Sequence, residues 1–422
     1  MNSVSLQEPS RIQHEPAEAM LSQAVSLASQ PSLPSLPSLG PCDQNVSPSH
    51  HQCLATIRAH SSHVSALAVD GDSLYTASSD GRIRVWPLDG GRRHEKPQDD
   101  DDGCSGAAAA TVVAACDSSA KCLLAAGDGL LLSSHQDGKI RAWRAGGRKD
   151  DGTPRQLVLR AVLPTCGDRL RALLRPWSYV QVRRHRWRAW VHHVDAVAAL
   201  AASPDGALLY SASWDRSLKV WRLPGFRCVE SVAAAHDDAI NALAVAADGH
   251  VYTGSADKRI RAWRRDPGRG NRHVLVQTME RHRSAVNALA LGVDGKVLYS
   301  GACDRSVVVW ERAGAGAGGD GRMEATGTLR GHRKAILCLA AAGDVVCSGS
   351  ADRTVRVWRR GAAENTGYTC LAVMEGHAAP VKSLVLVYGR DRGSSGGGSA
   401  LVCSGALDGE VKIWSVLVPC FF

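Results

Sequence analysis

The chain has 422 residues, and its 50 Lys and Arg exceed its 41 Asp and Glu to give a formal net charge of +9. This modest excess permits acidic partners without implying nucleic acid. The 13 Cys include no Cys-x-x-Cys pair and no zinc-type Cys/His spacing, and no apolar run of about eighteen residues occurs, which argues against a disulfide framework, a metal site and a membrane-spanning helix.

Residues 1–50 are rich in Ser, Pro and Gln and poor in aromatic residues. Such a segment buries too little apolar surface to offset the entropy of ordering, so we expect a disordered tail. Its run Pro31-Ser-Leu-Pro-Ser-Leu-Pro37 suits a polyproline II turn, either as a docking motif or as a plain linker. The tail has neither the basic start nor the apolar run of a signal peptide. With the odd cysteine number, this predicts a reducing compartment, cytoplasm and/or nucleus.

A strand, turn and strand unit recurs along the rest of the chain. In its clearest copy, residues 208–221, a β-rich run ends at Ser213, a polar turn carries Asp215 and an alternating run leads to Trp221. The same spacing of six residues joins Asp80 to Trp86, Asp137 to Trp143, Asp257 to Trp263, Asp304 to Trp310, Asp352 to Trp358 and Asp408 to Trp414. Seven copies predict one repeat body rather than two or three domains.

A histidine precedes six of the seven Asp residues, just before a short apolar run. The six are His60, His193, His236, His282, His332 and His377. Four units place a serine two residues before the Asp, namely Ser78, Ser213, Ser255 and Ser350. The second unit has His135 at that position and no upstream His, while the fifth and seventh have Ala302 and Ala406. We expect these three units to be the weaker ones, and the second to open first.

These positions resemble the WD40 repeat family, whose Gly-His, Ser-x-Asp and Trp positions match across roughly residues 52–416. Gly-His itself appears at Gly331-His332 and Gly376-His377, although no Trp is followed by the usual Asp. The resemblance implies an all-β fold, a single seven-bladed β-propeller over residues 51–418, in which a strand near 53–57 closes the last blade. Closure removes open sheet edges.

Long inserts are expected after the first and second blades, at residues 87–105 and at the basic insert 144–185. Shorter ones are expected at 311–325, 359–368 and 389–399. In a WD40 propeller these loops project from one face, which leaves the opposite face, made of the His turns and Asp turns, compact.

A narrower resemblance is to plant WD40 proteins of the JINGUBANG type. It is carried by Leu163-Pro-Thr, Tyr179-Val-Gln-Val-Arg-Arg-His-Arg, Leu209-Tyr-Ser-Ala-Ser-Trp-Asp-Arg and Gly349-Ser-Ala-Asp-Arg-Thr-Val. This likeness implies a regulatory or signalling scaffold, in reproductive development such as pollen germination, with transcription factors among its partners.

The His, Ser, Asp and Trp of one unit contain the residue types of a hydrolase triad. A catalytic centre would not recur in four of seven blades, so we expect structural networks. In these networks a buried Asp accepts hydrogen bonds from the His and the turn, while the Ser links to the Trp indole N–H. We therefore expect no enzyme activity, no cofactor and no metal.

Two features of the compact face are candidate partner contacts. The residue before the Asp is mostly small but is Trp214 in the third unit, and an aromatic anchor is the usual form of an interface hot spot. The alternative for Trp214 is packing on a neighbouring loop. After the Asp, Arg216, Lys258, Arg305 and Arg353 follow in four consecutive units as a basic arc, or as a solvated rim.

The insert after Trp143 is the other candidate. Asp168 is predicted to cap a short helix, which leads into Val182-Arg-Arg-His-Arg-Trp-Arg-Ala-Trp190. Basic and aromatic residues together suit nucleic acid. However, we expect 186–190 in the outer strand of the third blade, where alternation puts the side chains on different faces.

The leading prediction is therefore a monomeric, non-catalytic scaffold that binds other proteins on its compact face and contacts no membrane. A substrate receptor of a cullin-type ubiquitin ligase is the alternative, although that class would want a Trp-Asp-x-Arg motif and no Trp here precedes Asp. A nucleic-acid-binding regulator ranks below both.

Overall fold

The computed structural model describes residues 51–88, 111–145, 156–173, 179–183, 186–189, 191–292, 294–313, 322–361, 367–389 and 398–418. The chain divides into two units, residues 1–35 and 36–422, and all described residues lie in the second. The tail predicted over 1–50 lies outside the described residues, as does most of the insert predicted over 87–105.

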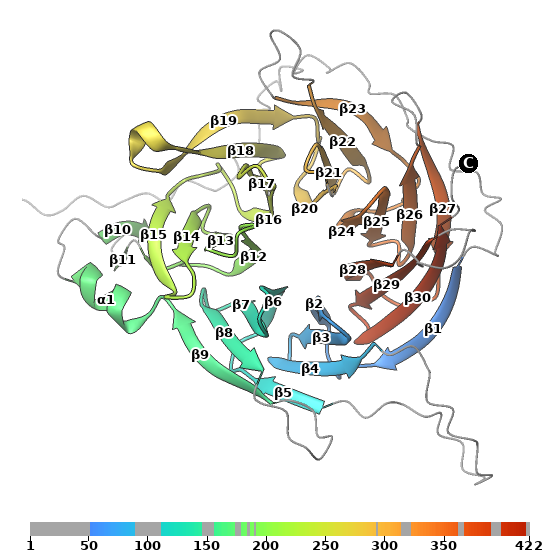
Figure 1. Ribbon diagram of the computed structural model, residues 1–422, viewed down its shortest axis with the longest axis horizontal. Helices are drawn as coiled ribbons and strands as arrows, with labels where there is room; N and C mark the ends of the chain where they lie inside the picture. The colour runs from blue at the N-terminus through green and yellow to red at the C-terminus, as the bar shows by residue number, and fades with distance from the viewer. Residues whose placement is uncertain are drawn as a thin grey trace, which may run out of the picture. The chain divides into compact units, whose positions relative to one another are not determined.

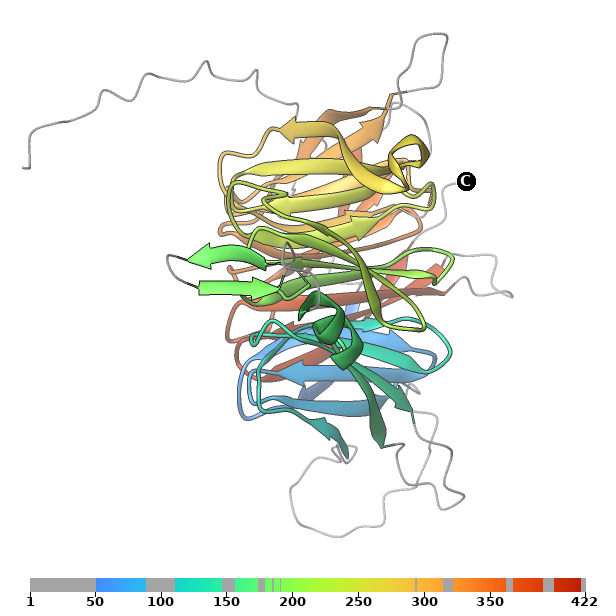
Figure 2. The ribbon, with the colours of Figure 1, turned by 90° about the vertical axis from the view of Figure 1, so that its left-hand side faces the viewer.

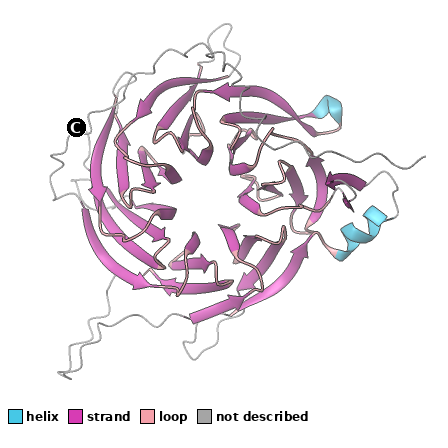
Figure 3. Cartoon of the chain, turned by 180° about the vertical axis from the view of Figure 1, so that it is seen from behind, coloured by secondary structure: helices cyan, strands magenta, loops and turns pink. Residues whose placement is uncertain are grey.

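Seven four-stranded sheets stand around a common axis in the described part of the chain (Figure 1). Neighbouring strands within each sheet are antiparallel, and the first strand of each blade is innermost (Figure 1). Figure 3 shows that strands make up most of the described chain, with helix confined to two short segments. The seven-bladed all-β propeller predicted from the repeat is confirmed.

The first three blades are built from the following strands. The first has β2 (Val64–Asp70), β3 (Ser73–Ser78), β4 (Arg82–Pro87) and β5 (Thr111–Ala115). The second has β6 (Ala120–Ala125), β7 (Leu130–His135), β8 (Ile140–Ala145) and β9 (Leu157–Leu163). The third has β12 (Val197–Ala202), β13 (Leu208–Ser213), β14 (Leu218–Arg222) and β15 (Arg227–Val232).

The next three blades continue the same order along the chain. The fourth has β16 (Ile240–Val245), β17 (Val251–Ser255), β18 (Arg259–Asp266), the short helix η3 (Pro267–Arg269) and β19 (Arg272–Glu280). The fifth has β20 (Val286–Leu291), β21 (Val297–Ala302), β22 (Val307–Arg312) and β23 (Met323–Leu329). The sixth has β24 (Ile336–Ala342), β25 (Val345–Ser350), β26 (Val355–Arg360) and β27 (Tyr368–Met374).

The seventh blade joins the two ends of the ring. It contains β28 (Val381–Gly389), β29 (Gly398–Ala406) and β30 (Glu410–Val418), and its outer strand is β1 (His51–Arg58). β1 pairs antiparallel with β30, from His51 opposite Val416 to Arg58 opposite Glu410. The strand expected near 53–57 thus covers the edge that β30 would otherwise expose.

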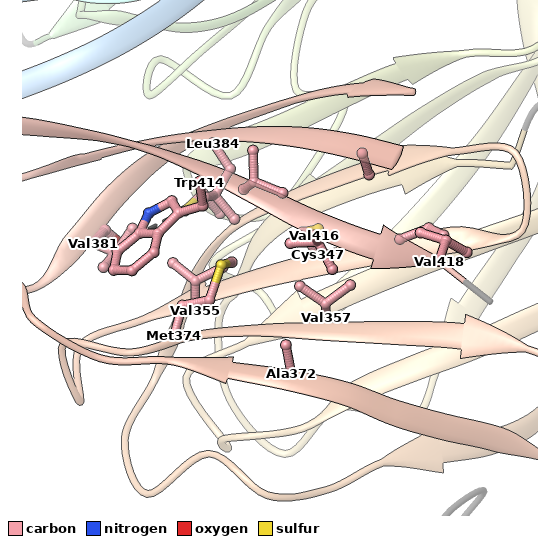
Figure 4. Packing of buried hydrophobic residues seen from close by; sticks show 14 residues of the cluster. Cys347, Val355, Val357, Ala372, Met374, Val381, Leu384, Trp414, Val416 and Val418 are labelled. Atoms are coloured by element: carbon pink, nitrogen blue, oxygen red, sulfur yellow. Dashed lines mark hydrogen bonds between the residues drawn. The ribbon is translucent and has the colours of Figure 1, made fainter. Parts of the chain in front are cut away.

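The hydrophobic core lies between blades rather than within one layer. The described residues form seven buried clusters, each drawing side chains from two adjacent blades. Between the sixth and seventh blades, Val355 and Met374 pack with Val381 and Trp414 (Figure 4). Burying one Trp removes ~150–250 Å² from water, worth several kcal/mol as an upper bound. Each blade is therefore stabilised by its neighbours.

The segment predicted as a basic insert over 144–185 is divided in the structure. It contains β9, which pairs with β8 as the outer strand of the second blade and buries Leu157 and Leu163. The helix α1 (Cys166–Leu173) follows at the rim, beside β15 (Figure 1). Leu157 and Leu163 fasten the two ends of β9 to the blade, whereas Val158 and Leu159 between them are exposed.

Two predictions are wrong: that residues 186–190 lie in the outer strand of the third blade, and that the face of the His turns and Asp turns is compact. The outer strand of the third blade is β15, whereas β11 (Arg186–Ala189) pairs with β10 (Tyr179–Arg183) in a separate hairpin. This hairpin projects to one side of the sheets (Figure 2) and leads directly into the turn that carries His193. The face of the His turns therefore has an insert beside the third blade and is not uniformly compact.

Candidate functional site

The predicted residues of the fourth blade form one continuous hydrogen-bonded chain. The two ring nitrogens of His236 lie 2.8 Å from Asp257 Oδ2 and 2.7 Å from Thr253 Oγ1. The indole of Trp263 donates to the same Thr253 hydroxyl at 2.9 Å. Backbone N–H groups of Asp237 and Arg259 also donate to Asp257. These bonds use the polar groups inside the blade, so the arrangement is structural.

The charge of Asp257 is stabilised by this network. Burial alone would raise the pKa of the carboxyl group, but the hydrogen bonds from His236 and the backbone lower it to about 2. A carboxylate held in this way is a poor general base near neutral pH.

The same chain recurs in the third, fifth and sixth blades. Its members are Asp215–His193–Ser211–Trp221, Asp304–His282–Ser300–Trp310 and Asp352–His332–Ser348–Trp358, with the His and Asp 2.9–3.1 Å apart. In the seventh blade Ser404 joins His377 and Trp414, while Asp408 lies 3.6 Å from the ring. In the first blade Thr76 joins His60 and Trp86, and Arg84 contacts both His60 and Asp80.

The hydroxyl group that accepts the indole N–H is not the predicted one. Ser78, Ser213, Ser255 and Ser350 do not bond the Trp, whose partner lies two residues earlier in the strand. The register explains the error. Leu209 lies opposite Trp221, so Ser211 is the diagonal neighbour on the same face, and Ser213 lies a further ~7 Å along the strand.

The predicted serine has a different task in the turn. Ser213 accepts the N–H of Asp215 at 3.1 Å and donates to the carbonyl oxygen of Asp195 at 3.1 Å. Ser255 makes the equivalent bonds with Asp257 and Asp238. This serine therefore fastens the Asp turn to the neighbouring His turn.

The second blade, which has no upstream His, takes its imidazole from His135 at the end of β7. The ring of His135 lies 2.8 Å from Ser133 Oγ, which accepts the indole N–H of Trp143. Burial, aided by the positive charge of Arg141, lowers the pKa of His135 to about 4. Asp137 pairs with Arg141 at 2.9 Å instead of with an imidazole. The sequence signal for this substitute network was His135 itself, since it is the histidine of a unit that has no upstream His.

Trp214 is both exposed and in contact with another blade. Its side chain is 39% exposed, and the Lys121 ammonium of β6 lies 5.4 Å from the ring centroid. Burial, together with the charge of Lys382, lowers the pKa of Lys121. A cation–π contact of this kind contributes ~0.5–1 kcal/mol. The ring is thus positioned by a neighbour while part of its surface stays open to a partner.

The four residues of the predicted basic arc are all exposed and share one backbone conformation. Arg216, Lys258, Arg305 and Arg353 have φ of 67°, 73°, 69° and 72°. The other three blades have Gly81, Gly138 and Gly409 at this position. Left-handed φ disfavours residues with a side chain by ~1–2 kcal/mol, so the basic side chains are held at a conformational cost.

Nearby backbone atoms explain why three blades have glycine after the Asp. A Cβ on Gly81, Gly138 or Gly409 would lie only 2.0–2.8 Å from a backbone oxygen of the next turn. The third to sixth blades carry Lys or Arg at this position. The face is therefore divided into a glycine part and a basic part.

Within the described ranges, no group of three or more His, Cys, Asp and Glu side chains could hold a metal ion. None of the described helices is long and apolar enough to cross a membrane. The interleaved basic and aromatic run 182–190, weighed as a nucleic-acid contact, lies where side chains are not described.

A family model described as "WD domain, G-beta repeat" matches residues 51–87, 186–222, 227–264, 273–311, 323–359 and 368–415. Together these segments make up more than half of the chain. The strands of the second blade, β6 to β9, lie outside every matched segment.

Parts of the chain are similar to known proteins. Striatin-4 of Homo sapiens is 46% identical over 57 residues, 13% of this chain and 8% of that protein. Ribosome biogenesis protein YTM1 of Phaeosphaeria nodorum is 24% identical over 191 residues, 45% of this chain and 39% of that protein. The chain thus matches less than two fifths of the length of either relative.

Among solved structures, the WD40 beta propeller domain of Doa1 is similar with a TM-score of 0.58 and 20% identity. The likeness covers 86% of this chain and 96% of that one. At this identity it is a likeness of fold.

Proposed function

The chain belongs to the WD40 repeat family, and from this premise we propose that it is a non-catalytic scaffold for protein–protein interaction. One observation carries the proposal. The His and Asp side chains of the repeats are bonded inside the blades, whereas Trp214 and the basic arc stay exposed on the face of the His turns and Asp turns. The chemistry of this face suits recognition rather than catalysis.

Trp214 is the proposed anchor of this face. Interface hot spots are enriched in Trp and Arg, because a rigid aromatic ring buries a large area at little entropic cost. The contact with Lys121 limits the motion of the ring before a partner arrives. Pre-positioned anchors bind more tightly, since less conformational freedom is lost on association.

We propose that the partners are regulatory proteins of a plant signalling pathway, in reproductive development such as pollen germination, with transcription factors among them. The support is the likeness of residues such as Tyr179–Arg186 and Leu209–Arg216 to plant WD40 proteins of the JINGUBANG type. The proposed location is the cytoplasm and/or the nucleus. Each cysteine in the described ranges is a free thiol, which favours a reducing compartment.

Affinity purification with mass spectrometry, comparing the wild type with Trp214→Ala, tests the proposal. Leu417→Ala is a matched control, because Leu417 is also an exposed apolar side chain, 56% exposed, but lies on β30. We expect Trp214→Ala to deplete partners that Leu417→Ala retains. An unchanged partner list would remove Trp214 from the interface, and recovery of a cullin-ligase linker with the wild type would support a substrate receptor instead.

A further inference from the structure

Basic side chains gather over the turns of the fifth and sixth blades. Six of them are exposed, and we call them the basic cluster: Arg283, Arg305, Arg330, Arg333, Lys334 and Arg353. Only Arg305 and Arg353 belong to the arc that the sequence predicted. The signal for Arg283 and Arg333 was a basic residue directly after the His in two consecutive units, and Arg330 and Lys334 lie beside the second of these His residues.

The backbone holds these residues in place. Asp304 Oδ2 accepts the N–H of Arg283 at 3.0 Å, so Arg283 and Arg305 flank one carboxylate. Asp352 Oδ2 accepts the N–H of Arg333 at 2.9 Å, so Arg333 and Arg353 flank the next. His282 and His332 already bond these two carboxylates. The acidic groups nearest the basic cluster therefore serve the interior of the blades.

The two blades are also joined to each other. The amide of Asn287 in β20 donates to the carbonyl oxygen of Ile336 in β24 at 2.8 Å. In each blade the Asp turn bonds its own His turn, as from Cys303 N–H to Ala285 at 2.9 Å and from Ala351 N–H to Ala335 at 2.9 Å. The basic cluster thus stands on a continuous bonded support.

The basic cluster lacks ion pairs of the kind that Arg259 makes in the fourth blade. Arg259 is paired with Glu280 at 2.6 Å and with Asp237 at 2.7 Å. None of the six side chains of the basic cluster has a hydrogen-bond or ion-pair partner among the described residues. This part of the face therefore carries an unbalanced positive charge.

The backbone angles show which substitution these positions tolerate. Arg305 and Arg353 hold φ of 69° and 72°, as Arg216 and Lys258 do at 67° and 73°, where the other three blades have glycine. Glycine would relieve the strain at these two positions.

We propose that the basic cluster binds an acidic segment of a partner protein, an extended peptide whose carboxylate or phosphoryl groups pair with the guanidinium groups. This rests on the proposed scaffold function. Five of the six residues are Arg, whose planar fork suits both anions. The residues before Asp304 and Asp352 are Cys303 and Ala351, so these turns offer no aromatic surface on which bases could stack.

The test is a fluorescence anisotropy titration of the full chain. The probes are a fluorescein-labelled oligoglutamate, a phosphoserine peptide that is otherwise neutral, and oligothymidylate. The variant Arg305→Gly with Arg353→Gly removes two charges and suits the left-handed φ, so it should fold. We expect it to bind the preferred peptide about tenfold more weakly, with affinity that falls as salt rises.

The matched control is Arg216→Gly with Lys258→Gly, which removes the same charge at the same turn position in the third and fourth blades. Its affinity should stay within about twofold of the wild type. Comparison of the two peptides decides between carboxylate and phosphoryl groups. An equal loss in both double variants, or tighter binding of oligothymidylate than of either peptide, would overturn the proposal.

The outcome is distinguishable from failure of the scaffold function. If Trp214→Ala depletes cellular partners while the Arg305 and Arg353 variant binds both peptides like the wild type, the scaffold stands and the basic cluster is not its acidic-peptide site. If the double variant loses peptide binding and Trp214→Ala retains every partner, the basic cluster stands without the Trp214 anchor.

Discussion

The second and fourth blades reach the same packing by different routes. In both, the indole of a buried Trp donates to a hydroxyl that also bonds an imidazole. In the fourth blade the imidazole comes from the upstream turn and binds Asp257, whose side chain is 6% exposed. In the second it comes from β7, and Asp137 is 26% exposed beside Arg141.

The difference separates two functions within one network. The Trp, hydroxyl and imidazole fill the interior of the blade and satisfy its polar groups, and they persist when the histidine comes from strand β7 instead of from the upstream turn. The Asp ties the Asp turn to the His turn of its own blade, as the bond from Asp237 N–H to Asp257 shows. That second function is weaker in the second blade, where the described donors to Asp137 lie in its own turn and in β8.

The largest expected effect should be equal in the two blades. Trp143→Ala and Trp263→Ala each remove an indole that is 5% exposed and bonded to a hydroxyl. Both should lower the free energy of unfolding by about 3–5 kcal/mol, measured by urea denaturation. A much smaller loss for Trp143→Ala would mean that the rebuilt network does not reproduce the packing of the fourth blade.

The contribution of His135 in the second blade to the free energy of unfolding should depend on pH. Burial lowers the pKa of His135 to about 4, so the unfolded chain binds this proton first as the pH falls. The stabilisation is complete above about pH 6.5 and is lost as the pH drops towards 4, by up to about 3 kcal/mol. His60, with a pKa of about 4, acts in the same direction.

The variant His135→Gln checks this assignment, because glutamine keeps a hydrogen-bonding side chain without titrating. Its free energy of unfolding should depend less steeply on pH between 6.5 and 4 than that of the wild type. Parallel profiles would assign the pH dependence elsewhere.

Removal of the Asp should destabilise the fourth blade more than the second. Asp257→Ala leaves His236 and two backbone N–H groups unsatisfied, so the expected loss is on the order of 1–3 kcal/mol. Asp137→Ala breaks a more exposed ion pair and should lose less than about 1 kcal/mol. Thermal unfolding measures both, and an unchanged midpoint for Asp257→Ala would refute the structural interpretation of the network.

The smallest effect concerns local opening without any substitution. Amides of β6 to β8 should exchange with solvent faster than those of β16 to β18, because the Asp of the second blade does not tie its turn to a His turn. Native-state hydrogen exchange with mass spectrometry resolves the two regions. Slower exchange in the second blade would contradict this interpretation.

The repeat, the number of blades and the candidate residues Trp214, Arg305 and Arg353 could all be predicted from the sequence. The Asp-to-Trp spacing describes a turn and the strand that follows it, which are local features of the chain. Even the departure in the second blade was visible in the sequence as His135.

Only the tertiary structure decided which groups meet. The choice of Ser211 over Ser213 depends on the register between β13 and β14. The pairing of β9 with β8 places residues 157–163 in the second blade, and the contact of Lys121 with Trp214 joins two blades. The basic cluster joins turns that are far apart in the sequence. Spacing along a chain specifies what each blade contains, but the closure of the ring determines which side chains become neighbours.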